Sequence, residues 1–176
     1  VDDGFTSLKF DQQLQATSAA SAIELIGAKK ALYKAGELSN RQKEVQESAY
    51  TLPSAAERTA AFNEANKLKK ESEAKQIEAA NKFAAFNLNE YQSNKVKIDQ
   101  ANELDERFTT EGRELAILLA EEASNFFTEA AILRSEVNES DRLTQKEVNL
   151  QKAYDFEVLA LQRQKEALKK LGMVVS

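Results

Sequence analysis

The sequence SAAERTAAFNEANKLKKESEAKQIEAANKFAAFNLNEYQSNKVKIDQANELDER, residues 54–107, contains neither proline nor glycine. Nothing local therefore ends a helix within this stretch, and at 1.5 Å per residue one continuous helix would be about 80 Å long. Pro53 precedes it, and Ser54 with Glu57 forms the capping-box pattern that begins a helix. We therefore predict a sharp corner at residues 52–54 and one long helix over residues 54–107.

The apolar pattern of this long helix is uneven. Residues 66–76 are nearly all polar, and a helix that is polar on every side either crosses solvent, is supported by i,i+4 pairs, or is broken. Asn87-Leu88-Asn89 is a possible break, since asparagine favours caps and turns. We predict one continuous helix with an exposed middle that overhangs the rest of the molecule. A regular apolar stripe follows the polar stretch: Ile77, Ala80, Ala84, Leu88, Tyr91, Ile98, Ala101, Leu104 and Phe108.

Two shorter helices are predicted before this corner, over residues 6–35 and 38–52. Apolar and small residues recur in the first at steps of three and four, the spacing of a helix that packs lengthwise on another. Residues 16–22 are almost all Ala, Ser or Thr, which indicates close packing of two backbones rather than binding. Gly36 suits the position after a helix end. The recurring residues are Leu14, Ser18, Ser21, Leu25, Ala28, Leu32 and Ala35.

After the long helix we predict helices over residues 110–137 and 140–171, with Gly172 ending the second. The first carries two adjacent apolar stripes, which predicts contact with more than one neighbour and a central place in the bundle. Residues 1–5 are expected to be a loose lead-in, and the apolar tail 173–176 to fold back or meet a partner.

The composition favours the same fold class. Five Gly and one Pro provide few turns, 30 % of residues are charged, and period-two runs typical of strands are missing. We predict an all-α fold: an elongated antiparallel bundle of about four to five helices with coiled-coil-like packing, in which residues 1–176 form a single domain.

Several kinds of chemistry are excluded by the absence of Cys and His. Cys/His zinc sites, thiol chemistry and His-ligated haem need these residues, and the di-iron sites of helical bundles use Glu-x-x-His motifs. We predict no catalytic, cofactor-binding or metal-ligating residue, and no enzyme activity.

Paired carboxylates remain as the strongest catalytic pattern. Glu121-Glu122 has Glu111, Glu114 and Glu129 nearby, and an acid–base dyad needs two environments that separate the pKa values. Adjacent helical residues point about 100° apart, so at most one of the pair faces the core. We interpret these glutamates as part of a solvent-exposed helix face that lies beside an apolar stripe of the core.

Two other patterns are weak. The tyrosines fall on or beside apolar stripes. This indicates positions at the edge of the core, with the hydroxyl in solvent, rather than stacking on a ligand. Asn138-Glu139-Ser140 matches an N-glycosylation acceptor, a pattern too short to argue from alone. The tyrosines are Tyr33, Tyr50, Tyr91 and Tyr154.

The charge pattern predicts no nucleic-acid partner. The net charge is −5, both signs are interleaved, and each Lys-Lys pair has acidic neighbours, whereas phosphate binding needs clustered positive charge.

No run approaches the roughly twenty apolar residues that span a bilayer, so no membrane span is predicted. A first residue of Val1 slightly favours export.

These observations predict a non-enzymatic structural or assembly protein that acts by lateral helix–helix association with its own copies or with partner helices. Helices of mixed Ala, Gln, Glu and Lys resemble the coiled-coil parts of exported envelope components and of phage virion proteins, which implies a component of that type. The alternative is a carrier in which amphipathic helices enclose a lipid or a small apolar ligand.

Overall fold

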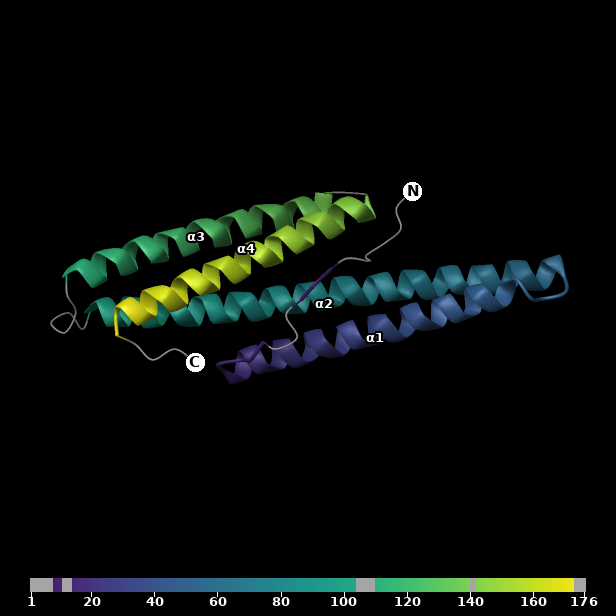
Figure 1. The fold of residues 1–176 in the computed structure, drawn as a ribbon, viewed down its shortest axis with the longest axis horizontal. Helices are drawn as coiled ribbons and strands as arrows, with labels where there is room; N and C mark the ends of the chain where they lie inside the picture. Colours follow the sequence, from purple (N-terminus) through teal and green to yellow (C-terminus); the bar gives the residue numbers. More distant parts are fainter. Residues whose placement is uncertain (1–7, 11–13, 104–109, 140–141, 173–176) are drawn as a thin grey trace.

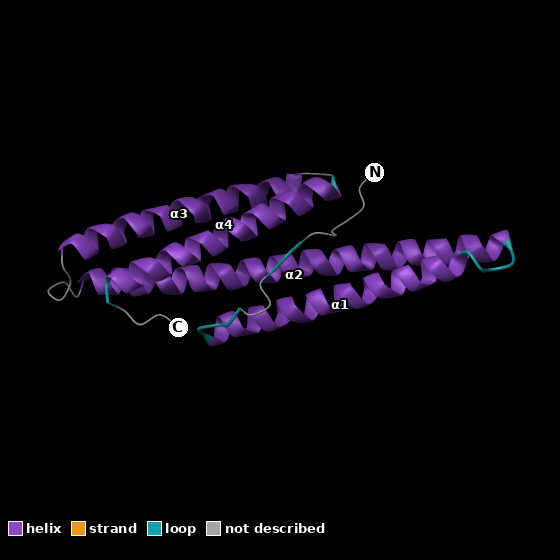
Figure 2. Cartoon of the chain, in the orientation of Figure 1, coloured by secondary structure: helices purple, strands orange, loops and turns teal. Residues whose placement is uncertain are grey.

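The computed structural model describes residues 8–10, 14–103, 110–139 and 142–172, and these residues form helices and no strands (Figures 1 and 2). The predicted all-α fold is confirmed. The four helices are α1 (Ala19–Ala49), α2 (Ala55–Glu103), α3 (Thr110–Glu139) and α4 (Leu143–Lys170).

The helices pack side by side in the order α1, α2, α4, α3 (Figure 1). Helices that follow one another form two antiparallel pairs, α1 with α2 and α3 with α4. The pairs are joined mainly through α2 and α4, which run parallel to each other. The central helix is therefore α2, and the predicted central place of residues 110–137 is wrong. α3 packs mainly on α4 and more sparsely on α2, where Phe127 stacks on Tyr91, so the predicted contact of this helix with more than one neighbour is confirmed.

The first two predicted helices are one helix, and it begins later than predicted. Ser18 caps α1, because its hydroxyl accepts a hydrogen bond from the Ser21 backbone N–H at 3.1 Å. Residues 8–10 and 14–16 are not helical. The prediction of helices over residues 6–35 and 38–52 is therefore wrong in its start and in its division.

Gly36 lies inside α1 and does not end it. Helix packing explains why: Ala31, Ala35 and Ala49, on both sides of Gly36, are buried. This burial favours a continuous helix. It outweighs the cost of glycine in a helix interior, which is roughly 1 kcal/mol relative to alanine. α1 ends at Ala49, and residues 50–54 form the turn that contains Pro53.

The predicted corner and the start of α2 are confirmed. The Ser54 hydroxyl accepts from the Glu57 backbone N–H at 3.1 Å, which is the N-cap half of a capping box, and donates to the Glu57 carboxylate at 3.1 Å. α2 then runs without interruption through residues 87–89 to Glu103. The predicted end at residue 107 lies outside the described residues.

The middle of the long helix, which we predict to be exposed, is only partly exposed. Ala65, Leu68 and Ser72 are buried against α1, and the Ser72 hydroxyl donates to the Ala35 carbonyl at 2.8 Å. The other faces are polar because α2 projects there past the α3–α4 pair (Figure 1). Ile77, where the apolar stripe resumes, packs against the same core cluster as Leu143, the first residue of α4. The change in composition thus marks where the second helix pair begins.

Two clusters form the core. The first joins α1, α2 and α4 where they overlap, and the second joins α2, α3 and α4 near the C-terminal ends of α2 and α4. The first contains Phe10, Leu25, Ala28, Ala80, Phe83, Phe86, Leu150 and Tyr154, and the second contains Ile98, Ala101, Ala116, Leu119, Ala167, Leu168 and Leu171.

The segment before α1 crosses the molecule and fills the first cluster. The Phe10 ring stacks on Phe83 with centroids 4.4 Å apart and meets Tyr154 edge-on at 5.0 Å. The Gln151 side chain accepts from the Lys9 N–H at 2.6 Å and donates to the Lys9 carbonyl at 3.0 Å. Residues 8–10 therefore form a strap against α2 and α4.

The two C-terminal helices follow their predicted ranges closely. α3 extends two residues beyond the predicted end at 137, and α4 ends beside Gly172, whose φ of 74° confirms the predicted glycine terminator. The predicted lead-in 1–5, the tail 173–176 and Ser140 lie outside the described residues.

Candidate functional site

Glu121 and Glu122 lie on the exposed side of α3, as the sequence predicts. The Glu122 carboxylate accepts from Arg163 Nε of α4 at 2.8 Å, and the Arg163 guanidinium lies over the Phe126 ring at 5.8 Å. Glu114 and Glu129 are also exposed, and the Glu111 side chain lies outside the described ones. Glu122 thus forms a surface ion pair with Arg163, and neither Glu121 nor Glu122 lies in an enclosed environment.

The four tyrosines differ in burial, whereas the sequence predicts the same core-edge position for all of them. Tyr91 is half-buried and stacks on Phe127 with centroids 4.1 Å apart, which fits a core-edge position. Tyr154 lies deeper, within the first core cluster. Tyr33 and Tyr50 are exposed, so the core-edge prediction is wrong for these two.

Only part of the glycosylation pattern falls on residues that the structure describes. Asn138 is exposed close to the C-terminal end of α3, whereas Ser140 lies outside the described residues.

A buried polar cluster, which the sequence analysis missed, connects three helices. Glu157 of α4 is 3 % exposed and accepts from Asn87 of α2 at 3.1 Å. Arg134 of α3 donates to both Glu157 oxygens, at 2.9 Å and 2.6 Å. A buried carboxylate needs such partners, because leaving it unpaired costs several kcal/mol.

A second polar contact lies one heptad further along the same two helices. Asn94 donates to Gln164 at 3.3 Å, and Gln164 donates to the Tyr91 carbonyl at 3.0 Å. Each pair, Asn87–Glu157 and Asn94–Gln164, is separated by 70 residues in the chain, which defines one parallel register for α2 and α4. The only sequence signal is the shared spacing of seven residues.

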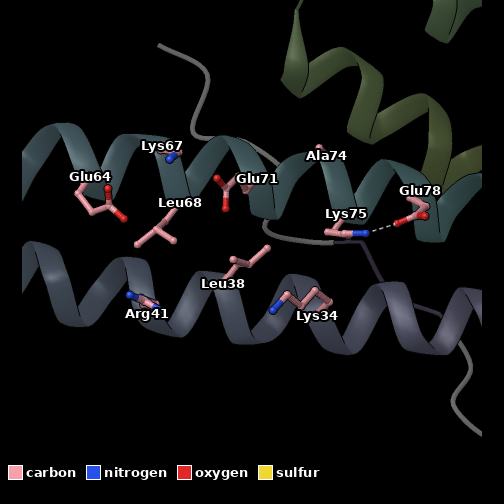
Figure 3. A pocket seen from close by; sticks show the side chains of 10 residues that line it. All are labelled: Lys34, Leu38, Arg41, Glu64, Lys67, Leu68, Glu71, Ala74, Lys75 and Glu78. Carbon is pink, nitrogen blue, oxygen red and sulfur yellow. Dashed lines mark hydrogen bonds and ion pairs between the residues drawn. The ribbon is translucent and has the colours of Figure 1, made fainter.

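An open groove of about 750 Å³ lies between α1 and α2 where this pair projects past the other two helices (Figure 3). Leu38 and Leu68 face each other across it, and the other lining side chains are mostly charged, of both signs. Lys75 donates to Glu78 at 2.9 Å, and this hydrogen bond with the Lys75 charge lowers the pKa of Glu78. The charged residues are Lys34, Arg41, Glu64, Lys67, Glu71, Lys75 and Glu78.

The outer face of α3 combines large apolar side chains with glutamates. Leu118 is 57 % exposed and Ile132 47 %, with Leu115 and Ile117 also exposed. Only Leu115 of these four residues belongs to an apolar stripe that the sequence predicts, so most of this exposed apolar face was not predicted. Its neighbours on the same exposed side are Glu114, Glu121, Glu122, Glu129, Glu136 and Glu139.

The outer face of α1 also carries large apolar side chains. Ile23 is 71 % exposed, and Ile26 and Tyr33 follow on the same side at helical spacing. Lys30 lies between them and is exposed. Exposed apolar residues that stand singly are common, whereas a run along one helix face is a candidate interaction surface.

Within the described ranges, no group of three or more Asp or Glu residues is placed to hold a metal ion. The described helices also lack a segment apolar enough to cross a bilayer. The outer faces of α1 and α3 are the strongest candidate functional surfaces, because large apolar side chains are exposed on both.

No protein-family model, curated protein or solved structure matches this chain. The candidate surfaces are therefore interpreted from their own geometry and chemistry.

Proposed function

We propose that this chain is a non-enzymatic structural protein that assembles by lateral association of its helices, with copies of itself or with partner subunits. The observation that carries the proposal is the outer face of α3, on which Leu115, Ile117, Leu118 and Ile132 are exposed while buried positions of the same helix are mostly alanine. Large aliphatic side chains stabilise a contact by about 25 cal/mol for each Å² removed from water.

The surface area of the chain supports association. It exposes 10868 Å², whereas a compact monomer of 19.6 kDa exposes about 8,600 Å². A standard interface buries roughly 800 Å² on each partner. The elongated row of helices therefore presents enough surface for more than one such contact.

The composition of the helices supports the finer form of this proposal, a component of an exported envelope or of a virion that associates by coiled-coil contacts. Ala, Glu, Lys and Gln dominate α1 and α2, and the polar pairs between α2 and α4 repeat at the heptad spacing of coiled coils.

The carrier alternative has less support. The groove between α1 and α2 is open and its rim is charged, whereas sites for small apolar ligands are enclosed and lined mostly by apolar side chains. A bound lipid would have little apolar surface to contact there beyond Leu38 and Leu68.

Light scattering combined with small-angle X-ray scattering tests the proposal on the purified full chain. We expect an elongated species whose mass rises above 19.6 kDa with concentration. A compact particle of monomer mass at every concentration would contradict assembly. Mass spectrometry of solvent extracts tests the carrier alternative through stoichiometric co-purifying lipid.

A further inference from the structure

We infer that the site beneath the strap is a peptide-binding site, and that copies of this chain associate by placing their straps in one another's sites. The strap is residues 8–10, and the strap site is formed by Phe83 of α2 with Gln151 and Tyr154 of α4. The inference rests on the proposed assembly function and names the contact that joins the copies.

Gln151 binds the backbone of the strap rather than its side chains. Its side-chain oxygen accepts from the Lys9 N–H at 2.6 Å, and its side-chain nitrogen donates to the Lys9 carbonyl at 3.0 Å. Paired bonds to the N–H and the carbonyl of one residue are also how a neighbouring strand holds an added peptide. The same nitrogen donates to Asp155 at 3.1 Å, which orients the amide. This contact suits a non-helical peptide, whose backbone groups are free to pair.

The aromatic rings beside Gln151 add a preference for one side chain. The Phe10 ring stacks on Phe83 with centroids 4.4 Å apart and meets Tyr154 edge-on at 5.0 Å. Both arrangements are favourable for aromatic rings, and Phe10 is 8 % exposed in this position. The strap site therefore takes a peptide with an aromatic residue directly after the residue whose backbone is bound.

The strap is anchored separately from the helix that follows it. The Glu90 carboxylate accepts from the Thr17 N–H at 3.0 Å and from the Thr17 hydroxyl at 2.7 Å, and Ser18 caps α1. None of these contacts involves residues 8–10. The strap can therefore leave its site while Thr17 stays bound to α2 and α1 stays capped.

A second copy of the chain carries the matching ligand, because its strap is identical. Exchange of straps replaces each bond to Gln151 and each ring contact by the same contact from another copy, and exchange of an identical element is a low-cost route to association. Within one chain the strap is tethered close to its site, which gives it a high effective concentration. Exchange is therefore expected where copies are concentrated, as in an assembly.

The chain has no cysteine, so a substituted cysteine is its one thiol. Lys9→Cys labels the strap, since the Lys9 side chain is exposed and only its backbone is bound. Val148→Cys labels the site, because Val148 is exposed one turn before Gln151 on α4. Glu166→Cys is the matched control, an exposed position on the same face of α4 but about 27 Å further along.

The Lys9→Cys and Val148→Cys chains are mixed at a concentration where light scattering shows assembly, and are then treated with a short bismaleimide. On a denaturing gel we expect covalent heterodimers at a yield several-fold above that of Lys9→Cys mixed with Glu166→Cys. Adding Gln151→Ala to the Val148→Cys chain should lower the yield to the control level, because both backbone bonds are lost. A chain with Lys9→Cys and Val148→Cys together, diluted to a monomer, should be linked internally.

Equal yields with Val148→Cys and Glu166→Cys would overturn the inference, as would a yield that Gln151→Ala leaves unchanged. In either case an oligomer in light scattering leaves the proposed assembly standing and rejects only the exchange of straps. A double-cysteine chain without an internal link would also overturn the inference, because the strap would not hold its place on α4. Monomers at every concentration would reject the proposed self-association itself.

Discussion

Asn87 of α2 and Glu157 of α4 form a buried hydrogen bond of 3.1 Å between two parallel helices. The same 70-residue offset relates Asn94 to Gln164, and it also relates Ala80 to Leu150 in one core cluster and Ala101 to Leu171 in the other. A shift of either helix by one residue would leave these polar groups unpaired. The polar pairs therefore specify how the two helix hairpins are joined.

Glu157→Ala should lower the free energy of unfolding by about 2–4 kcal/mol. The substitution leaves Asn87 and Arg134 without their shared acceptor, and the effect is moderated because the Arg134 side chain is 21 % exposed. Urea unfolding monitored by circular dichroism measures the change. Glu166→Ala, at an exposed ion pair of 3.5 Å on the same helix, should cost well under 1 kcal/mol. Equal losses in the two variants would contradict a structural role for the buried cluster.

Gly36→Ala should stabilise the protein by about 0.5–1 kcal/mol, because alanine favours a helix interior over glycine. A Cβ atom at Gly36 has no neighbour within 4 Å. Gly27→Ala provides the comparison, since its Cβ would lie 3.0 Å from the Lys82 side chain and the gain should be smaller. Thermal unfolding measures both. A destabilised Gly36→Ala variant would show that α1 is divided there.

Ala74→Pro should destabilise the protein by about 3 kcal/mol or more, because Ala74 lies inside the continuous helix α2 and proline removes a backbone donor and clashes with the preceding turn. Ala55→Pro is the matched control. Ala55 is the first residue of α2, where proline is well tolerated. Similar stability of the two variants in urea would indicate that the polar stretch 66–76 interrupts the helix.

Much of the fold follows from local signals in the sequence. Pro53 and the Ser54–Glu57 capping box fix the corner, and Gly172 marks the end of α4. Gly36 shows the limit of such signals, because burial of Ala31 and Ala35 on α2 overrides a glycine that would otherwise end the helix. Ser18 is one of the recurring residues that predict a helix over residues 6–35, yet it caps the helix.

The candidate surfaces were harder to predict for a different reason. Two adjacent apolar stripes have the same pattern whether the helix is central or lies at a margin, so residues 110–137 predict a central helix, whereas α3 packs mainly on α4 and lies at a margin of the row. Ile117, Leu118 and Ile132 lie on neither predicted stripe, so their exposed face was not predicted. The buried polar cluster was missed because its members lie in three helices. Apart from the seven-residue spacing that Asn87 and Asn94 share with Glu157 and Gln164, nothing in the sequence indicates that Asn87 and Glu157 are partners.

Phe10→Ala should lower the free energy of unfolding by about 3 kcal/mol, although the sequence pattern placed Phe10 in a helix and gave it no core role. Its ring is 8 % exposed and lies between Phe83 and Tyr154, so its removal leaves a cavity where α2 and α4 meet. Phe62→Ala is the control, because Phe62 is half-buried and its ring contact is with the exposed Tyr50. Its loss should be clearly smaller. If urea unfolding shows that Phe10→Ala costs no more than Phe62→Ala, the strap does not contribute to the core, and residues 8–10 only lie on the surface of the bundle.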